Sequence, residues 1–233
     1  MTESSLLTWA TTFLKDIQIF DLLKYCAGPL SGSFAGAFLA YKLTAKREAY
    51  KQRQERIQAA QEVLYFLSYH LNTVYALYRQ LFMPKKDHTV RHLSIPGSII
   101  KSYENYNIDV KPISFLLSEE DPCMLGHIST CNDFFFTIVG SINKRSELHS
   151  IFLDILDKEK VPSGVSLDDE KLKMLVGERV LKQLEEVTNA IYLMTDKYLK
   201  EVGTTSENLR KLLQRIYPEC KFNCFVIDEK YKK

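Results

Sequence analysis

Apolar residues recur at helical spacing along most of the chain, and this pattern predicts an all-α protein. Within 44–83 neither glycine nor proline interrupts a row of apolar residues that alternate in steps of three and four. Such a row is the a/d pattern of a coiled coil or of a bundle helix. Its members are Ile57, Ala60, Leu64, Leu67, Leu71, Val74, Tyr78 and Leu81. Aromatic residues beside the row favour a bundle helix, which Pro84 ends.

The segment before this row has a different composition. Residues 25–41 carry no charge and lie between Lys24 and Lys42. A helix of this length spans roughly 26 Å, slightly less than the ~30 Å hydrocarbon core of a bilayer. We therefore predict a transmembrane helix over 22–43 that runs into the long helix. A re-entrant or interfacial segment and a buried helix of a soluble domain are the alternatives.

Small residues recur at every fourth position of this segment. They are Gly28, Gly32, Gly36 and Ala40, and on a helix they form one narrow stripe. Small residues at this spacing let two helix backbones approach closely in a membrane. The stripe therefore predicts an association face between copies of the chain.

Basic residues follow the uncharged segment more densely than they precede it. Lys42, Lys46, Arg47 and Lys51 come directly after it. The positive-inside rule places this side in the cytoplasm and the N-terminus outside. Basic residues at that position are also expected to contact anionic lipid headgroups. The localisation expected from the sequence is therefore the cell inner membrane, crossed once, with the C-terminal body in the cytoplasm.

The remaining elements complete the predicted organisation. Residues 1–21 form an amphipathic helix that lies on the membrane or packs on the protein. Residues 44–83 form a basic stalk and bundle helix, and 84–120 form a linker. An antiparallel helical bundle is predicted over 121–218, because short connections join its helices. The tail over 219–233 contains a short extended stretch.

Three helices are expected within the bundle. The first covers 122–157, the second begins at Ser166 and reaches Val202, and the third covers 206–217. The first two begin behind clusters of acidic residues, which are favourable at a helix N-terminus. Gly203 and Thr204 are expected to separate the last two helices.

Composition narrows the function classes. The net charge of +2 is too small to indicate a nucleic-acid partner. The five cysteines are irregularly spaced, so free thiols in a reducing compartment are expected. No phosphate-binding loop, nucleophile elbow or zinc-protease motif occurs. We therefore expect a non-enzymatic protein without a cofactor.

Two sets of side chains could still bind metal. Cys123, His127 and Cys131 would line one helix face, and Cys220 and Cys224 repeat the spacing. Thiolates and imidazole are zinc ligands, but the two-residue spacer of zinc knuckles is absent. Buried or solvated side chains are the simpler interpretation, and the same holds for His88 and His92.

One pair of residues suggests a catalytic alternative. Arg145 and His149 lie one helical turn apart, after Asn143. The pair is similar to the arginine–histidine motif of HEPN-type ribonucleases, which has at least one more residue between the two. The resemblance implies an arginine that holds phosphate and a histidine that assists cleavage, and hence a membrane-tethered nuclease.

The order of the parts resembles a group of uncharacterised bacterial membrane proteins. The stretches that carry this likeness are FLAYKLTAKREAYKQRQERIQAA, SFLLSEEDP, INKRSELH and RIYPECKF. The likeness implies a bacterial setting and a layout similar to membrane effectors of antiviral (antiphage) defence. The resulting hypothesis is a self-associating membrane protein whose helical body receives a cytoplasmic protein partner. A soluble structural subunit of a larger complex is a further alternative.

Overall fold

The structure, a computed structural model, describes residues 3–100, 103–118, 121–162 and 167–223. For 3–32, 34, 35, 104 and 118 it describes the backbone alone. These ranges contain helices and connections but no strand, so the predicted all-α class is confirmed for them. The chain divides into two compact units, Met1–Glu55 and Arg56–Lys233, which are considered separately below.

The first unit is the N-terminal part of one helix, α1 (Glu3–Leu77). We expected one helix over 1–21 and a second over 22–43, but the structure has a single helix through both ranges. No glycine or proline occurs between residues 17 and 27, so no residue there favours a break. The amphipathic character expected of 1–21 rests on side chains that lie outside the described ones.

The predicted transmembrane helix is not supported by the structure. Among the described residues, no helix combines the length and the apolar character needed to cross a membrane. Six of the 17 residues in 25–41 are glycine, serine or proline, which makes the segment less apolar than its lack of charge suggests.

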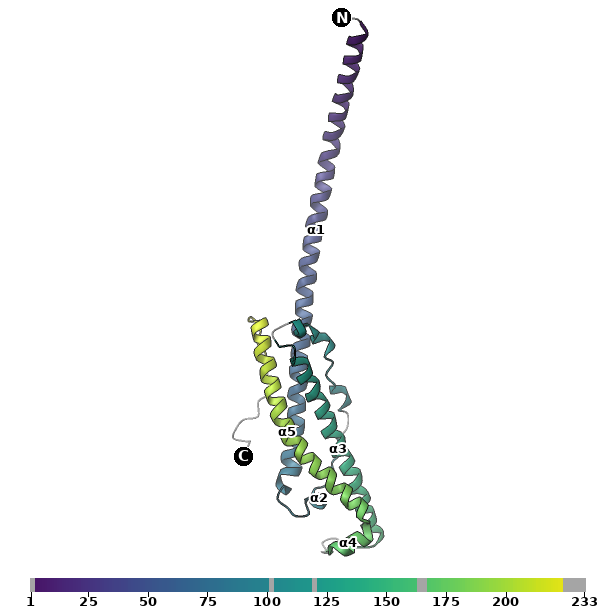
Figure 1. Cartoon of the computed structure of the whole chain (residues 1–233), viewed down its shortest axis with the longest axis vertical. Coiled ribbons are helices and arrows are strands. Elements are labelled where there is room, and N and C mark those ends of the chain that lie inside the picture. The colour runs from purple at the N-terminus through teal and green to yellow at the C-terminus, as the bar shows by residue number, and fades with distance from the viewer. Residues whose placement is uncertain (1–2, 101–102, 119–120, 163–166, 224–233) are drawn as a thin grey trace. The chain divides into compact units, whose positions relative to one another are not determined.

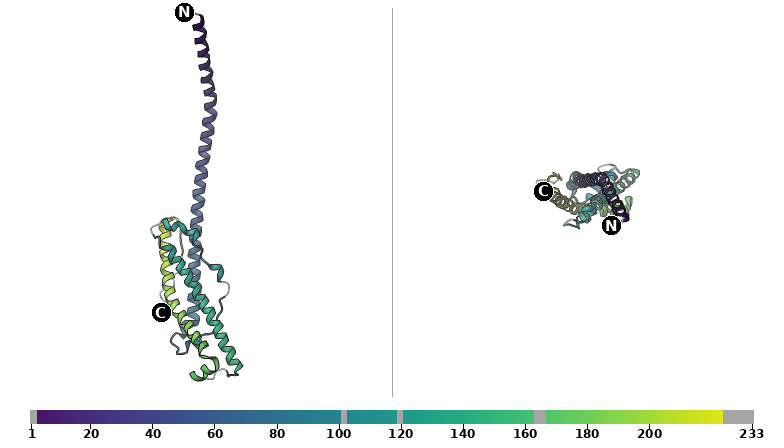
Figure 2. Two further views of the ribbon diagram at one scale, coloured as in Figure 1. Left: turned by 45° about the vertical axis from the view of Figure 1, so that its right-hand side comes forward. Right: turned by 90° about the horizontal axis from the view of Figure 1, so that it is seen from above.

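The second unit is a bundle built from the rest of α1, α3 (Met124–Lys158) and α5 (Glu178–Ile216) (Figures 1 and 2). At one end of the bundle, Phe115 lies against Arg56 and Tyr217. At the other end, Phe82 packs on Tyr192. These contacts make α5 antiparallel to α1.

The predicted antiparallel bundle covers 121–218, and the contacts between α3 and α5 show how the two long helices of that range run. Cys131 of α3 meets Thr205 of α5, and Arg145 meets Thr188, so α3 is also antiparallel to α5. Helices α1 and α3 therefore run in the same direction. Parallel neighbours require a long return connection, and residues 84–120 form that connection.

The apolar row predicted in α1 forms one wall of the bundle core. Ile57, Ala60, Leu64, Leu67, Leu71, Val74 and Tyr78 are all buried, and Leu81 is partly buried. The predicted apolar residues of α3 are buried as well, among them Ile128, Phe135, Ile138 and Ile142. Burying such side chains is worth about 1.5–3 kcal/mol each, so this core is the main source of the bundle's stability.

The return connection consists of short helical turns that pack on the bundle. They are the π-helical turn η1 (Tyr78–Phe82), η2 (Met83–Lys85), α2 (Arg91–Ser94), η3 (Glu104–Tyr106) and η4 (Lys111–Ser118). Their buried anchors are Ile95, Ile108, Ile113 and Leu116. The segment predicted as a linker is thus part of the folded core where it is described.

The last two helices meet at a glycine that we did not predict as a break. Helix α4 (Asp169–Val176) begins with Asp168, whose carboxylate accepts a hydrogen bond from the Lys171 amide at 2.7 Å. It ends at Gly177, whose φ of 88° lies in a region that other residues rarely adopt. Helix α5 then runs through Gly203, so the break predicted there is wrong.

Of the predicted tail, only residues 219–223 are described. Phe222 is buried, with its ring 6.4 Å from that of Tyr217. The rest of the predicted extended stretch, including Cys224, lies outside the described residues.

A buried histidine links α1 to α3 and to the return connection. The His70 ring stacks on Phe135 with centroids 3.7 Å apart, and its Nε2–H donates to the carbonyl of Tyr106 at 2.7 Å. Its Nδ1 is buried with no hydrogen-bond partner. Burial lowers the pKa of His70 to about 4, because no partner there stabilises a second proton.

This histidine predicts an acid-sensitive fold. The unfolded chain takes up a proton on His70 near pH 6.5, whereas the folded chain does so only near pH 4. The free energy of unfolding should therefore fall as the pH drops through this window, by about 3 kcal/mol in all from this residue. Urea unfolding of wild type and His70→Gln across the window measures the effect. His70→Gln should have a lower free energy of unfolding than wild type at neutral pH. Its free energy of unfolding should also decrease less as the pH is lowered. The exposed His127→Gln should leave that fall unchanged, and equal acid sensitivity in all three proteins would contradict the assignment.

Candidate functional site

The strongest candidate for a functional surface is the part of α1 in the first unit. Every described side chain from residue 36 to residue 55 is exposed. Large apolar side chains are among them, with Phe38, Leu39, Tyr41, Leu43 and Tyr50 each 52–72% exposed. Exposed apolar residues gathered on one segment are typical of an interaction surface.

The predicted association stripe lies within this segment. Gly28 and Gly32 are in the helical backbone of α1, and nothing further is described for them. Gly36 and Ala40 are exposed, and a Cβ added to Gly36 would meet no atom within 4 Å. The described part of the stripe is therefore accessible to another helix.

The basic residues proposed to contact lipid are exposed too. Lys51 pairs with Glu55 at 3.9 Å, and the Lys42 ammonium lies 4.9 Å from the centre of the Phe38 ring. Lys46 and Arg47 also point into solvent. Exposed ion pairs contribute little to stability, so these charges are available for binding.

Arg145, the first member of the predicted catalytic pair, is a buried structural residue. Only 1% of its side chain is exposed. Its guanidinium donates to the carbonyl oxygens of Pro96 at 3.2 Å, His92 at 2.9 Å and Ile95 at 2.5 Å, and to Thr188 Oγ1 at 3.2 Å. Burial lowers its pKa to about 10, so it stays charged at neutral pH. Four of its five N–H groups bond to the protein and the side chain is buried, so Arg145 is not placed to hold a phosphate in this structure.

His149, the second member of the pair, is also buried. Its Nε2 lies 3.3 Å from the carbonyl oxygen of Leu93. Burial and the nearby Arg145 charge both lower its pKa. The two residues therefore fasten the return connection, and the nuclease resemblance is not carried into the function proposed below.

Two further residues of α3 hold the same connection, and their role was not predicted from the sequence. Asn143 accepts from the Ile100 amide at 2.8 Å and donates to the Ile100 carbonyl at 3.1 Å. Ser146 accepts from the Ser98 amide at 2.8 Å and donates to the Ser98 carbonyl at 2.7 Å. Each side chain satisfies both polar groups of one backbone residue, much as a neighbouring strand would. We call Asn143, Arg145, Ser146 and His149 the polar clasp.

The candidate metal ligands that the structure describes do not form a cluster. Cys123 and His127 are exposed, whereas Cys131 is buried and its thiol donates to Thr205 Oγ1 at 3.6 Å. Burial raises the pKa of the Cys131 thiol to about 11, which favours the neutral thiol over the thiolate in the chain as it stands. Within the described part of the chain, no three His, Cys, Asp or Glu side chains form a possible metal site.

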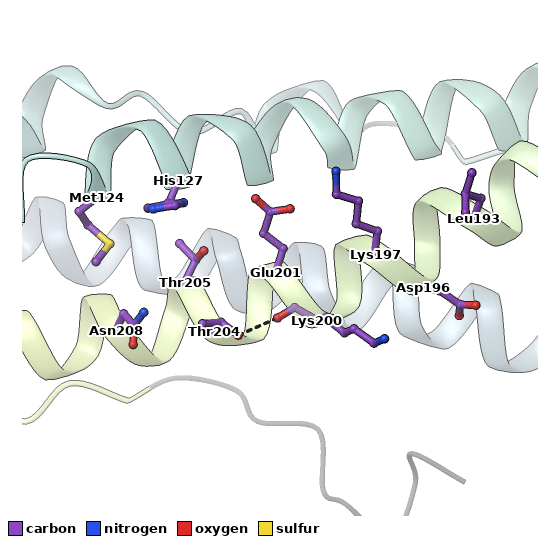
Figure 3. A pocket seen from close by; sticks show the side chains of 10 residues that line it. All are labelled: Met124, His127, Leu193, Asp196, Lys197, Lys200, Glu201, Thr204, Thr205 and Asn208. Carbon is purple, nitrogen blue, oxygen red and sulfur yellow. Dashed lines mark hydrogen bonds between the residues drawn. The ribbon is translucent and has the colours of Figure 1, made fainter.

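Helices α3 and α5 border a groove of about 600 Å³ (Figure 3). Lys197 and Glu201 point from α5 towards α3, and Met124 and His127 lie on the α3 side. The Lys197 ammonium lies 5.1 Å from the centre of the Phe134 ring. Asp196, at one end, already accepts from Tyr78 at 2.9 Å and from Lys86 at 3.4 Å. The groove mixes charges of both signs and indicates no particular ligand.

No family model matches this chain, and neither a curated protein nor a solved structure does.

The polar clasp predicts a large stability loss when Arg145 is removed. Arg145→Leu leaves the buried carbonyl of Ile95 and the partly buried carbonyls of His92 and Pro96 without this donor, so it should cost about 3 kcal/mol. Urea denaturation of wild type, Arg145→Leu and the control Lys144→Leu measures the loss in free energy of unfolding. The neighbouring Lys144 is exposed, and Lys144→Leu should change stability by less than about 0.5 kcal/mol. Equal stabilities of wild type and Arg145→Leu would show that Arg145 does not hold the connection.

Proposed function

We propose that this protein associates with a membrane through residues 25–41 of α1, meets other copies of itself there, and acts through protein–protein contacts. The observation that carries the proposal is the exposed apolar surface of α1. In an uncharged stretch next to a dense basic segment, Phe38, Leu39 and Tyr41 are at least 60% exposed. An isolated helix gains little stability without burying such residues.

The composition of residues 25–41 favours a membrane-bound form in which several copies of the helix contact one another. Glycine and serine are poorly suited to contact lipid chains, but they suit contact between helices. Copies that meet through Gly32, Gly36 and Ala40 would turn their small residues towards one another and their aromatic residues outward. Phe38 and Tyr41 lie on the side of the helix away from Gly36 and Ala40, as this arrangement requires.

Membrane association is tested by expressing the whole chain and treating the membrane fraction with alkaline carbonate. A chain held in the bilayer stays in the pellet. Release into the supernatant would end the membrane proposal and favour a helical subunit of a larger complex.

Self-association is tested at Gly36, because a side chain added there meets nothing in the single chain. Gly36→Leu should keep the fold, since leucine also has the higher helix propensity. It should weaken cross-linking between copies in the membrane about tenfold, about 1.4 kcal/mol. The neighbouring Ala37→Leu lies off the stripe and should have little effect. Equal cross-linking of the two variants and wild type would contradict the association face.

A further inference from the structure

The basic part of α1 in the first unit has one face with a coiled-coil repeat. Leu43 and Tyr50 are seven residues apart, and Leu39 and Lys46 precede each by four. All four are exposed. Seven-residue spacing of large side chains is the pattern that packs against another helix. We call Leu39, Leu43, Lys46, Arg47 and Tyr50 the basic seam.

Charges are segregated around the basic seam. At about 100° per residue, Lys46 and Arg47 lie within roughly 60° of Leu43. Glu48 and Glu55 lie more than about 100° from Leu43, and Glu55 already pairs with Lys51 at 3.9 Å. The seam therefore presents apolar and cationic side chains together, and the acidic side chains of this segment lie elsewhere.

We propose that the basic seam binds an acidic amphipathic helix of a partner protein. This inference rests on the proposed function, in which the chain acts through protein–protein contacts, and it names the kind of partner. Apolar residues of the partner would cover Leu43 and Tyr50, and its flanking carboxylates would meet Lys46 and Arg47. Charge complementarity of this kind selects partners and orients them.

A second copy of the chain does not fit the seam in parallel register. Lys46 would lie against the Lys46 of the other copy, and Arg47 would lie near its counterpart. Like charges at such positions oppose pairing. Copies that meet through Gly36 and Ala40 would therefore separate beyond Lys42, which leaves the seam open from Leu43 to Tyr50.

A lipid surface fits the seam less well than a helix does. A helix that lies on a membrane needs its apolar residues on one broad face. Here Phe38 and Tyr41 lie on the side opposite Leu43, and both are exposed. A narrow apolar row flanked by cations matches the width of a second helix.

The test uses the full chain in detergent micelles and a synthetic helical peptide of about 28 residues, four heptads. The peptide has leucine at a and d and glutamate at e and g, and a second peptide has lysine in place of glutamate. Binding is followed by fluorescence anisotropy. The acidic peptide should bind and the lysine peptide should not. Lys46→Gln with Arg47→Gln should weaken binding about fivefold.

A matched control has the same change in net charge on the opposite side of the helix. Ala45→Glu with Gln52→Glu should alter binding by less than about twofold. Equal binding of the two peptides, or equal effects of the two double variants, would overturn the proposal. It would also be overturned if Lys46→Gln with Arg47→Gln weakened binding to phosphatidylglycerol vesicles but not to the acidic peptide. Because the peptide assay needs no bilayer, its result is independent of the carbonate test.

Discussion

The structure depends on covering the apolar residues of α1. From Ile57 onward α3, α5 and the return connection cover them, and side chains such as Leu64 and Leu67 are at most 1% exposed. In the first unit every described side chain from residue 36 to residue 55 is exposed, and Leu39 and Leu43 are more than half exposed. The bundle thus accounts for the second part of the helix. For the first part, our proposal is that a membrane and other copies of the chain cover the apolar residues.

The parallel arrangement of α1 and α3 imposes a second constraint. The chain must return along the bundle before α3 begins, and irregular backbone cannot be buried unless its polar groups are paired. The polar clasp meets this requirement with side chains, because Asn143 and Ser146 each bind both backbone groups of one residue. Arg145 completes the clasp by binding carbonyl oxygens at the end of α2. Arg145, which resembles a catalytic residue in the sequence, therefore has a structural role in holding the return connection.

Features that depend on local pattern could be predicted from the sequence. The apolar row from Ile57 to Tyr78 is buried as predicted, and the predicted helix 122–157 corresponds to Met124–Lys158. The break at Gly177 was missed, because a glycine within a helical pattern does not reveal whether its φ is positive. Gly203 was misread for the same reason.

Features that depend on packing could not be predicted in this way. Nothing local distinguishes a buried Arg145 from a solvated one, because its partners lie 43 to 53 residues away in the chain. Cys131 and His127 are one turn apart, yet one is buried and the other exposed. For the surface of α1, the sequence identified the stripe and the basic residues. The structure adds that the described members of both are accessible.

The central claim is that residues 25–41, the uncharged part of α1, associate with a membrane. Hydrogen–deuterium exchange of the full chain, with and without phospholipid vesicles, tests it most directly. Without vesicles, amides in 25–41 should exchange rapidly, because no packing protects an isolated helix. With vesicles, the same amides should be slowed by about 100-fold or more, while those of α3 and α5 stay unchanged. Exchange in 25–41 that is the same with and without vesicles would contradict the account.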